Sequence, residues 1–86
     1  MNSKLIRMLI VDNQHNNRLK KALQEKGIQV EWKEYLNIAK KEIDNSSFDL
    51  IVSDYYLPDG RGTELIKYVR CFSSSNKKTA LVILSG

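Results

Sequence analysis

Short apolar runs alternate with amphipathic segments along the whole chain, and this alternation restricts the fold more than any other feature. Four runs have the length and composition of strands, and the three segments between them repeat apolar residues at helical spacing. The strands are expected at 5–11, 28–32, 48–53 and 79–85, and the helices at 17–26, 36–45 and 62–71. Strands joined through helices pair in parallel, with right-handed crossovers. The sequence therefore predicts an α/β fold with one parallel sheet and helices on both faces.

The predicted elements differ in how much apolar surface they carry. The run 28–32 alternates apolar and polar residues, as an edge strand does, whereas 48–53 and 79–85 have the unbroken apolar runs of central strands. Each helix has one apolar face that we expect to pack on the sheet. These faces comprise Leu19, Ala22 and Leu23, then Leu36, Ala39 and Ile43, then Leu65, Ile66, Val69 and Phe72. The polar stretch 73–76 is expected to be only a loop.

Length and composition limit the class of protein. At 86 residues the chain has room for one hydrophobic core, since domains usually contain about 100–150 residues. Hydrophobic residues make up 42% and charged residues 28%, which is the balance of a soluble folded protein. No run reaches the roughly 18–20 apolar residues of a membrane span. The single cysteine excludes an internal disulfide, so we expect a cytoplasmic protein.

The charge of the chain gives little support to nucleic-acid binding. The net charge is +4, but the basic residues form separate doublets at 20–21, 40–41 and 77–78 rather than one block. Aromatic residues do not interleave with these doublets in a stacking pattern. We therefore expect no direct contact with nucleic acid, and we interpret the doublets as solvated helix faces.

Two carboxylates and a hydroxyl stand where predicted strands end. Asp12 follows the first strand, Asp54 ends the third and Ser85 ends the fourth. Ligands of open parallel sheets bind beyond the carboxyl ends of the strands, so these side chains are expected in one crevice. Neighbouring carboxylates repel unless a cation joins them, and Mg²⁺ takes carboxylate and phosphate oxygens. The alternative is that both aspartates only cap turns and helices.

Three segments resemble the receiver domain of two-component response regulators. They are LIVD at 9–12, DLIVSDYYLPDGRG at 49–62 and ALVILSG at 80–86, and they occur in the family's order and at its usual spacing. The central segment is the most specific, because a strand ending in aspartate is followed two residues later by Leu-Pro-Asp-Gly and a helix. The resemblance implies a three-layer, flavodoxin-like α/β fold with parallel strand order 2-1-3-4.

The resemblance also assigns roles to individual residues. It implies that Asp54 is the phospho-acceptor, which receives a phosphoryl group from a histidine kinase or a phosphotransfer protein and forms an aspartyl-phosphate. Asp12 and the backbone carbonyl of Tyr56 would bind Mg²⁺, and Asp54 would contact the same ion. Ser85 would donate a hydrogen bond to the phosphoryl group, and Gly86 would leave room for it. Such a domain is a regulatory module of a phosphorelay and not an enzyme.

One residue departs from the family pattern beside the predicted metal. A second acidic residue commonly follows the first aspartate, and here that position is Asn13. An amide oxygen can bind Mg²⁺ but carries no charge, so we expect weaker metal binding and slower phosphotransfer than in a typical receiver. The alternative is that water bridges Asn13 to the ion and the substitution is harmless.

A second departure concerns the family's last elements. The sequence has no counterpart of the fourth helix, the fifth strand with its phosphate-binding lysine, or the last helix. Lys77 and Lys78 precede the fourth predicted strand and therefore lie at its opposite end. We expect residues 1–86 to form an incomplete receiver domain, with the fifth strand absent.

The incomplete pattern leaves two main functions open, and a basic nucleic-acid binder is a third, weaker option that only the dispersed charge supports. The first is a signal-transduction module that accepts a phosphoryl group on Asp54 with Mg²⁺. The alternative is a fragment that does not switch and serves as a dimerisation or partner-binding module, such as a decoy. In the order 2-1-3-4 the apolar strand 79–85 lies at an open edge, which is a template for pairing. We therefore expect a homodimer, or a partner that completes the sheet.

Overall fold

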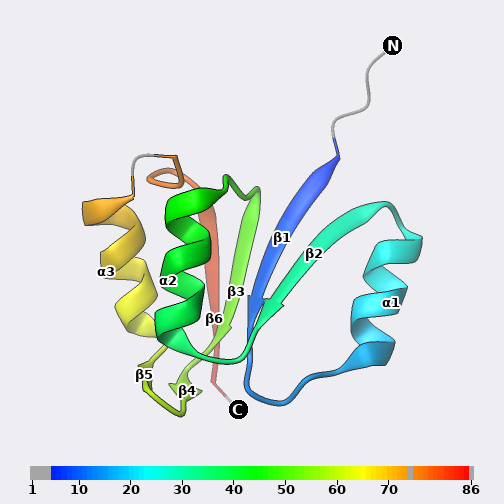
Figure 1. Ribbon diagram of the computed structural model, residues 1–86, viewed down its shortest axis with the longest axis horizontal. Coiled ribbons are helices and arrows are strands. Elements are labelled where there is room, and N and C mark those ends of the chain that lie inside the picture. Colours follow the sequence, from blue (N-terminus) through cyan, green and yellow to red (C-terminus); the bar gives the residue numbers. More distant parts are fainter. Residues whose placement is uncertain (1–4, 74, 86) are drawn as a thin grey trace.

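The computed structural model describes residues 5–73 and 75–85 and contains a four-stranded parallel sheet between helices (Figure 1). In chain order the elements are β1 Ile6–Val11, α1 Asn17–Glu25, β2 Ile28–Lys33, α2 Leu36–Asn45, β3 Leu50–Asp54, β4 Tyr56–Leu57, β5 Gly60–Arg61, α3 Thr63–Phe72 and β6 Ala80–Leu84. The strands of the main sheet lie in the order β2-β1-β3-β6. This is the predicted order 2-1-3-4, because β6 is the fourth strand of that sheet. The predicted fold class is confirmed.

The short strands β4 and β5 were not expected from the sequence, which indicated only a turn there. They pair antiparallel, Tyr56 with Arg61 and Leu57 with Gly60, and form a small hairpin directly after β3. Neither strand is long enough to show a periodic apolar pattern. Across the two described ranges, none of the helices combines the length and the apolar character that a bilayer span requires.

The main core lies between one face of the sheet and the helices α2 and α3. Leu9 and Ile51 are paired across β1 and β3, and both are fully buried. Figure 1 shows α2 and α3 side by side on this face. Their buried residues continue the core from the helix side, and they are Leu36, Ala39, Ile43, Leu65 and Val69. Burial of these side chains supplies the main stabilising term of the fold.

The opposite face is covered by α1 over β2 and β1 only. Ile10, Val30 and Trp32 form a second, smaller buried cluster there, with Leu23 of α1 packed against it. Every residue of α1 stays at least partly exposed, and Leu19 is 45% exposed. Of the expected inward face of the first helix, only Leu23 is half-buried, whereas Leu19 and Ala22 are exposed.

The part of this face formed by β3 and β6 remains uncovered in the described chain. We call it the open face, and it consists of Leu50, Val52, Ala80, Val82 and Leu84. Val82 is 44% and Leu84 51% exposed, while Leu50 and Val52 are half-buried. Of the described strands, β6 forms one edge of the sheet, beside the open face, and β2 forms the other edge.

Two residues of α3 were expected to face inward and do not. Ile66 is 38% exposed and Phe72 is 70% exposed, whereas Leu65 and Val69 are buried. In Figure 1, α3 is the outermost element on its face of the sheet, with α2 on one side of it. Because no described element packs against its other side, only a narrow stripe of α3 is buried.

The connection from α3 to β6 is fixed by polar contacts that the sequence did not indicate. The Asn76 side chain is buried, accepts a hydrogen bond from the Phe48 N–H at 2.7 Å, and donates to the carbonyl of Ile43 at 2.9 Å. Arg70 of α3 donates to the carbonyls of Lys77 at 2.9 Å and Thr79 at 2.8 Å. Asn76, Lys77 and Thr79 are therefore held by hydrogen bonds to α2, α3 and Phe48, which goes beyond the polar loop that was expected; Ser74 lies outside the described residues.

Candidate functional site

A polar crevice lies at the carboxyl ends of β1 and β3. It has a volume of about 290 Å³, and its lining residues are Asp12, Gln14, Asp54, Tyr55, Tyr56 and Leu84. Asp12 directly follows β1, and Asp54 is the last residue of β3. Since β1 and β3 are parallel and in register from Met8 with Leu50 to Val11 with Ser53, their ends bring the two carboxyl groups together. This is the juxtaposition that the strand pattern predicts.

The two carboxyl groups influence each other directly. Burial raises the pKa of Asp54 above its ordinary value, and a hydrogen bond with the Asp12 side chain and the negative charge of Asp12 raise this pKa further. Two neighbouring carboxyl groups can share a proton, or they can bind a cation between them in place of that proton. The site therefore favours binding of positive charge.

The donor set of the crevice fits a hard divalent cation. It offers the carboxylates of Asp12 and Asp54, the amide group of Gln14 and backbone carbonyls, and such oxygens are the ligands of Mg²⁺. Asp12 is held in place because its Oδ1 accepts a hydrogen bond from the Gln14 N–H at 2.9 Å. In the ranges 5–73 and 75–85, no three His, Cys, Asp or Glu side chains gather as a metal site. A cation bound to the two carboxylates would therefore fill the rest of its coordination shell with carbonyl, amide or water oxygens.

The hairpin after Asp54 leaves the Tyr56 carbonyl available. The Gly62 N–H donates to the Tyr55 carbonyl at 2.7 Å, so Tyr55 and Gly62 stand at a hydrogen-bonding position of the hairpin, although the Tyr55 N–H donates to Leu84 instead. Hydrogen-bonded and non-hydrogen-bonded pairs alternate along an antiparallel ladder, so the next pair, Tyr56 with Arg61, is of the second kind. The Arg61 N–H accordingly donates outward to Glu64 at 2.9 Å. The Tyr56 carbonyl is likewise directed away from β5.

The remaining predicted site residues lie outside this set of lining residues. Asn13 is exposed in the loop after β1, and the neighbouring Gln14 lines the crevice. Ser85 is exposed and follows Leu84, which pairs with Asp54 across β3 and β6. Gly86 lies outside the described residues. The roles predicted for Asn13 and Ser85 therefore stay predictions.

The loop that follows Asp54, residues 55–62, is attached to several elements, and we call it the acceptor loop after the role predicted for Asp54. The Tyr55 N–H donates to the carbonyl of Leu84 on β6 at 2.8 Å, and Leu57 is buried in the main core. A Cβ atom at Gly62 would overlap the Asp54 carbonyl oxygen, so only glycine allows this close approach. The loop is therefore packed tightly against the backbone of Asp54.

A further contact of the acceptor loop was missed from the sequence. Both carboxylate oxygens of Asp59 accept hydrogen bonds from α2, at 2.7 Å from the Leu36 N–H and at 2.9 Å from the Asn37 N–H. Slight burial raises the pKa of Asp59, but these amide bonds and the charge of Lys40 outweigh it and lower the pKa below its ordinary value. The sequence signal was indirect: α2 has Tyr35 at its N-cap, a residue type that does not cap helices.

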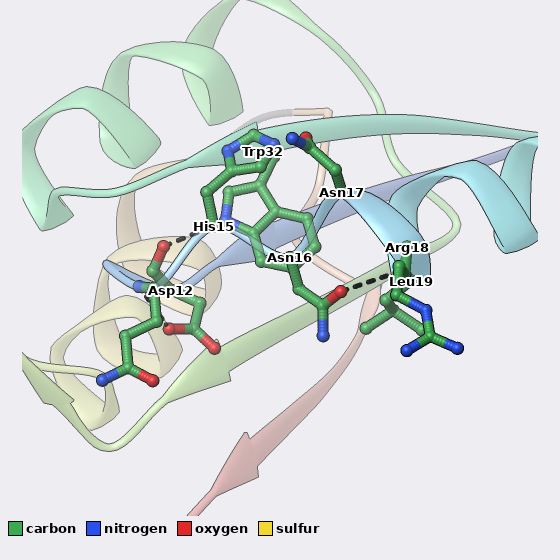
Figure 2. A pocket seen from close by; sticks show the side chains of 8 residues that line it. Asp12, His15, Asn16, Asn17, Arg18, Leu19 and Trp32 are labelled. Atoms are coloured by element: carbon green, nitrogen blue, oxygen red, sulfur yellow. Dashed lines mark hydrogen bonds between the residues drawn. The ribbon is translucent and has the colours of Figure 1, made fainter.

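Trp32 is a second contact that the sequence did not reveal. Its indole N–H donates to the backbone carbonyl of Asp12 at 2.9 Å, and the ring of His15 stacks on it with centroids 4.9 Å apart (Figure 2). These rings border a cavity of about 380 Å³ beside the acidic crevice. Figure 2 also shows the Asn16 side chain turned toward α1, where it accepts from the Leu19 N–H at 3.0 Å. The loop after β1 is therefore held at Asp12 by Trp32 and at Asn16 by the first turn of α1.

Comparison with known families decides what this arrangement is. The model of the response regulator receiver domain matches residues 8–86, which is nearly the whole chain. The chain belongs to the response regulator receiver domain family. The predicted resemblance is thereby confirmed, and receiver domains are the phospho-acceptor modules of two-component systems. A comparison with curated proteins gave no match.

Solved receiver structures have the same fold. The non-phosphorylated HemR receiver domain of Leptospira biflexa is 28% identical with a TM-score of 0.80, over 93% of this chain and 64% of that one. The chemotaxis response regulator CheY4 of Vibrio cholerae is 29% identical with a TM-score of 0.83, over 93% and 68%. The beryllofluoride-activated NtrC4 receiver domain dimer is 26% identical with a TM-score of 0.78, over 90% and 63%. The present chain thus spans about two thirds of the receiver chains that it resembles.

Proposed function

We propose that this receiver domain accepts a phosphoryl group on Asp54 from a phosphohistidine donor, with Mg²⁺ bound beside Asp12. The observation that carries the proposal is the meeting of the Asp12 and Asp54 carboxyl groups at the ends of β1 and β3. The partner would be a histidine kinase or a phosphotransfer protein of the cytoplasm. The role is regulatory rather than enzymatic.

The transfer would be a single displacement at phosphorus. A carboxylate oxygen of Asp54 attacks the phosphorus, the phosphorus–nitrogen bond of the donor breaks, and its electron pair stays on the imidazole, which takes up a proton. Asp54 must be ionised to attack, whereas its raised pKa favours the protonated form. Bound Mg²⁺ would favour the ionised form and would neutralise charge on the phosphoryl oxygens.

The other predicted residues have supporting roles in this proposal. Asp12 and the Tyr56 carbonyl would hold the ion, and Asn13 would contribute weakly or through water. Ser85 follows the strand paired with the acceptor and would donate a hydrogen bond to the phosphoryl group. Because Asn13 brings no charge, the proposal includes weaker Mg²⁺ binding than in receivers that have two acidic residues at this point.

Intact mass spectrometry after incubation with acetyl phosphate and Mg²⁺ tests the proposal. The wild-type protein is expected to gain one phosphoryl group, and Asp54→Asn is expected to gain none. Asp44→Asn is the matched control, because Asp44 is an exposed aspartate that bonds Tyr68 far from the crevice. Equal labelling of wild type and Asp54→Asn, or no labelling of the wild type, would contradict the proposal.

A second candidate function is dimerisation, which the open face and the edge strand β6 favour. Exposed backbone groups on an edge strand can pair with a second chain, and the open face adds uncovered apolar surface beside that edge. One similar receiver, NtrC4, has been solved as a dimer. A second copy would pair β6 with β6 around a two-fold axis. Size-exclusion chromatography with light scattering tests this, and a monomer at micromolar concentrations would contradict it.

A further inference from the structure

Asp59 joins two parts of the molecule that are separate in the sequence. It lies in the turn between β4 and β5, while its two hydrogen-bond donors are the first residues of α2, 22 and 23 positions earlier. Helix α2 has Tyr35 at its N-cap in extended conformation, so Asp59 takes the place of a local capping side chain. The hairpin turn is therefore held against the amino end of α2.

The same turn determines where the Tyr56 carbonyl lies. Tyr56 and Asp59 are three residues apart on a hairpin whose two-residue strands allow little independent movement. On the crevice side, the hairpin is attached through the Tyr55 N–H to β6. On the far side, Asp59 provides the only side-chain hydrogen bonds that the described structure gives between the hairpin turn and α2. Loss of this attachment would let the hairpin tilt about its anchored end.

We propose that Asp59 is a positioning residue for the acceptor site, which holds the acceptor loop on α2 so that the Tyr56 carbonyl faces the bound cation. The inference rests on the proposed function, because it concerns the same metal and the same acceptor. Residues that orient ligands of a metal commonly affect its affinity without touching it. Asp59 thereby connects the position of α2 to the geometry around Asp54.

The competing explanation is that Asp59 only caps α2 and has no effect on the crevice beyond general stability. A second substitution separates the two explanations. Serine at position 35 would give α2 a cap from its own chain, because Ser is a favoured N-cap residue and Tyr35 already has extended backbone angles. The double variant Asp59→Ala with Tyr35→Ser therefore restores the helix cap but not the attachment of the hairpin.

The experiment measures Mg²⁺ affinity and thermal stability on the same variants. Trp32 is the only tryptophan and bonds the Asp12 carbonyl, so its fluorescence reports Mg²⁺ titrations without any phosphoryl donor. We expect Asp59→Ala to weaken Mg²⁺ binding by about tenfold. Asp59→Asn keeps an acceptor oxygen and should stay closer to the wild type. Asp44→Ala removes a similar exposed carboxylate, at the other end of α2, and should leave Mg²⁺ affinity unchanged.

The double variant gives the decisive outcome. Recovery of thermal stability with Mg²⁺ affinity still weak supports the positioning role. The positioning role is overturned if the double variant recovers both thermal stability and Mg²⁺ affinity. It is also overturned if Asp59→Ala keeps the wild-type Mg²⁺ affinity, or if Asp44→Ala loses as much affinity as Asp59→Ala. None of these outcomes contradicts the proposed function. Wild-type protein that binds no Mg²⁺ overturns both proposals. If Asp59→Ala does not fold, the Mg²⁺ affinities of Asp59→Asn and of the double variant are compared with that of the wild type, and this comparison decides whether Asp59 positions the site.

Discussion

At the level of single residues, the strongest electrostatic feature is the contact between Asp12 and Asp54. Burial raises the pKa of Asp54, and the hydrogen bond and negative charge of Asp12 raise it further, so ionisation of Asp54 is less favourable in the folded protein. The folded protein thus retains unfavourable charge at the point where we propose that it binds a metal. Sites that bind cations commonly carry such a cost in the metal-free state.

The first prediction is that Asp54→Asn stabilises the metal-free protein at neutral pH. The pKa of Asp54 is raised on folding. At a pH between the ordinary aspartate pKa and this raised pKa, Asp54 is protonated in the folded protein but ionised in the unfolded chain. The free energy of unfolding therefore falls as the pH rises from the ordinary aspartate range through the raised pKa. We expect Asp54→Asn to gain roughly 0.5 kcal/mol at pH 7 and almost nothing at pH 3.

Urea unfolding in the presence of a chelator measures this difference. Asp12→Asn should give a similar gain, since it removes the other member of the pair. Asp44 lies elsewhere and its carboxylate accepts a hydrogen bond from the Tyr68 hydroxyl, so Asp44→Asn should give no gain in stability. A loss of stability in Asp54→Asn at pH 7 would show that repulsion between the carboxylates is not the dominant effect.

The second prediction concerns Gly62, whose Cα lies against the backbone of Asp54. A Cβ here would overlap the Asp54 carbonyl oxygen and approach the Ser53 Oγ to 2.9 Å, so neighbouring backbone must move. Overpacking of this kind costs about 1–3 kcal/mol, and we expect Gly62→Ala to lose stability in that range. Chemical denaturation measures the loss, with Thr63→Ala as the neighbouring exposed control. Wild-type stability in Gly62→Ala would contradict the close approach.

At the level of elements, the helices differ in how firmly they are attached. Helices α2 and α3 each place fully buried side chains in the main core, whereas every residue of α1 is at least partly exposed. Local opening is easier for an element with few buried contacts. We therefore predict that amide hydrogens of α1 exchange earlier than those of α2 and α3. Hydrogen exchange read by mass spectrometry tests this, and equal protection of the three helices would contradict it.

The sequence predicted the elements and the meeting of Asp12 with Asp54 because both depend on periodic patterns. Apolar periodicity identifies strands and helices, and parallel strands bring their carboxyl ends to one edge. The missed contacts of Asp59, Trp32 and Asn76 are hydrogen bonds of individual side chains to backbone groups 20 to 33 positions away. No local pattern specifies such bonds, because they depend on how finished elements lie in space. The short strands β4 and β5 were missed for a different reason, since two residues cannot form a period.

At the level of the whole molecule, apolar surface is distributed unevenly between the two faces of the sheet. One face is covered by α2 and α3, and the other leaves Val82 and Leu84 about half exposed beside a free edge. We predict that Val82→Lys weakens self-association, because it places a charge at the centre of β6 and on the open face. Light scattering across a dilution series measures the effect, with Lys78→Ala as a control outside the strand. Equal association of the Val82→Lys and wild-type proteins would exclude this surface.

The contacts of Arg70 and Asn76 have a kinetic consequence for such a dimer. They fasten the connection that precedes β6 to α3 and to the end of α2, so β6 cannot leave its own sheet unless these bonds break. Two copies that exchanged their β6 strands would therefore have to unfold in part first, and exchange of partners would be slow. Two copies that pair along intact β6 edges meet as rigid bodies. For dimers paired along intact β6 edges, we expect labelled and unlabelled subunits to mix as fast as the dimer dissociates. This mixing should be complete before the protein unfolds to any measurable extent.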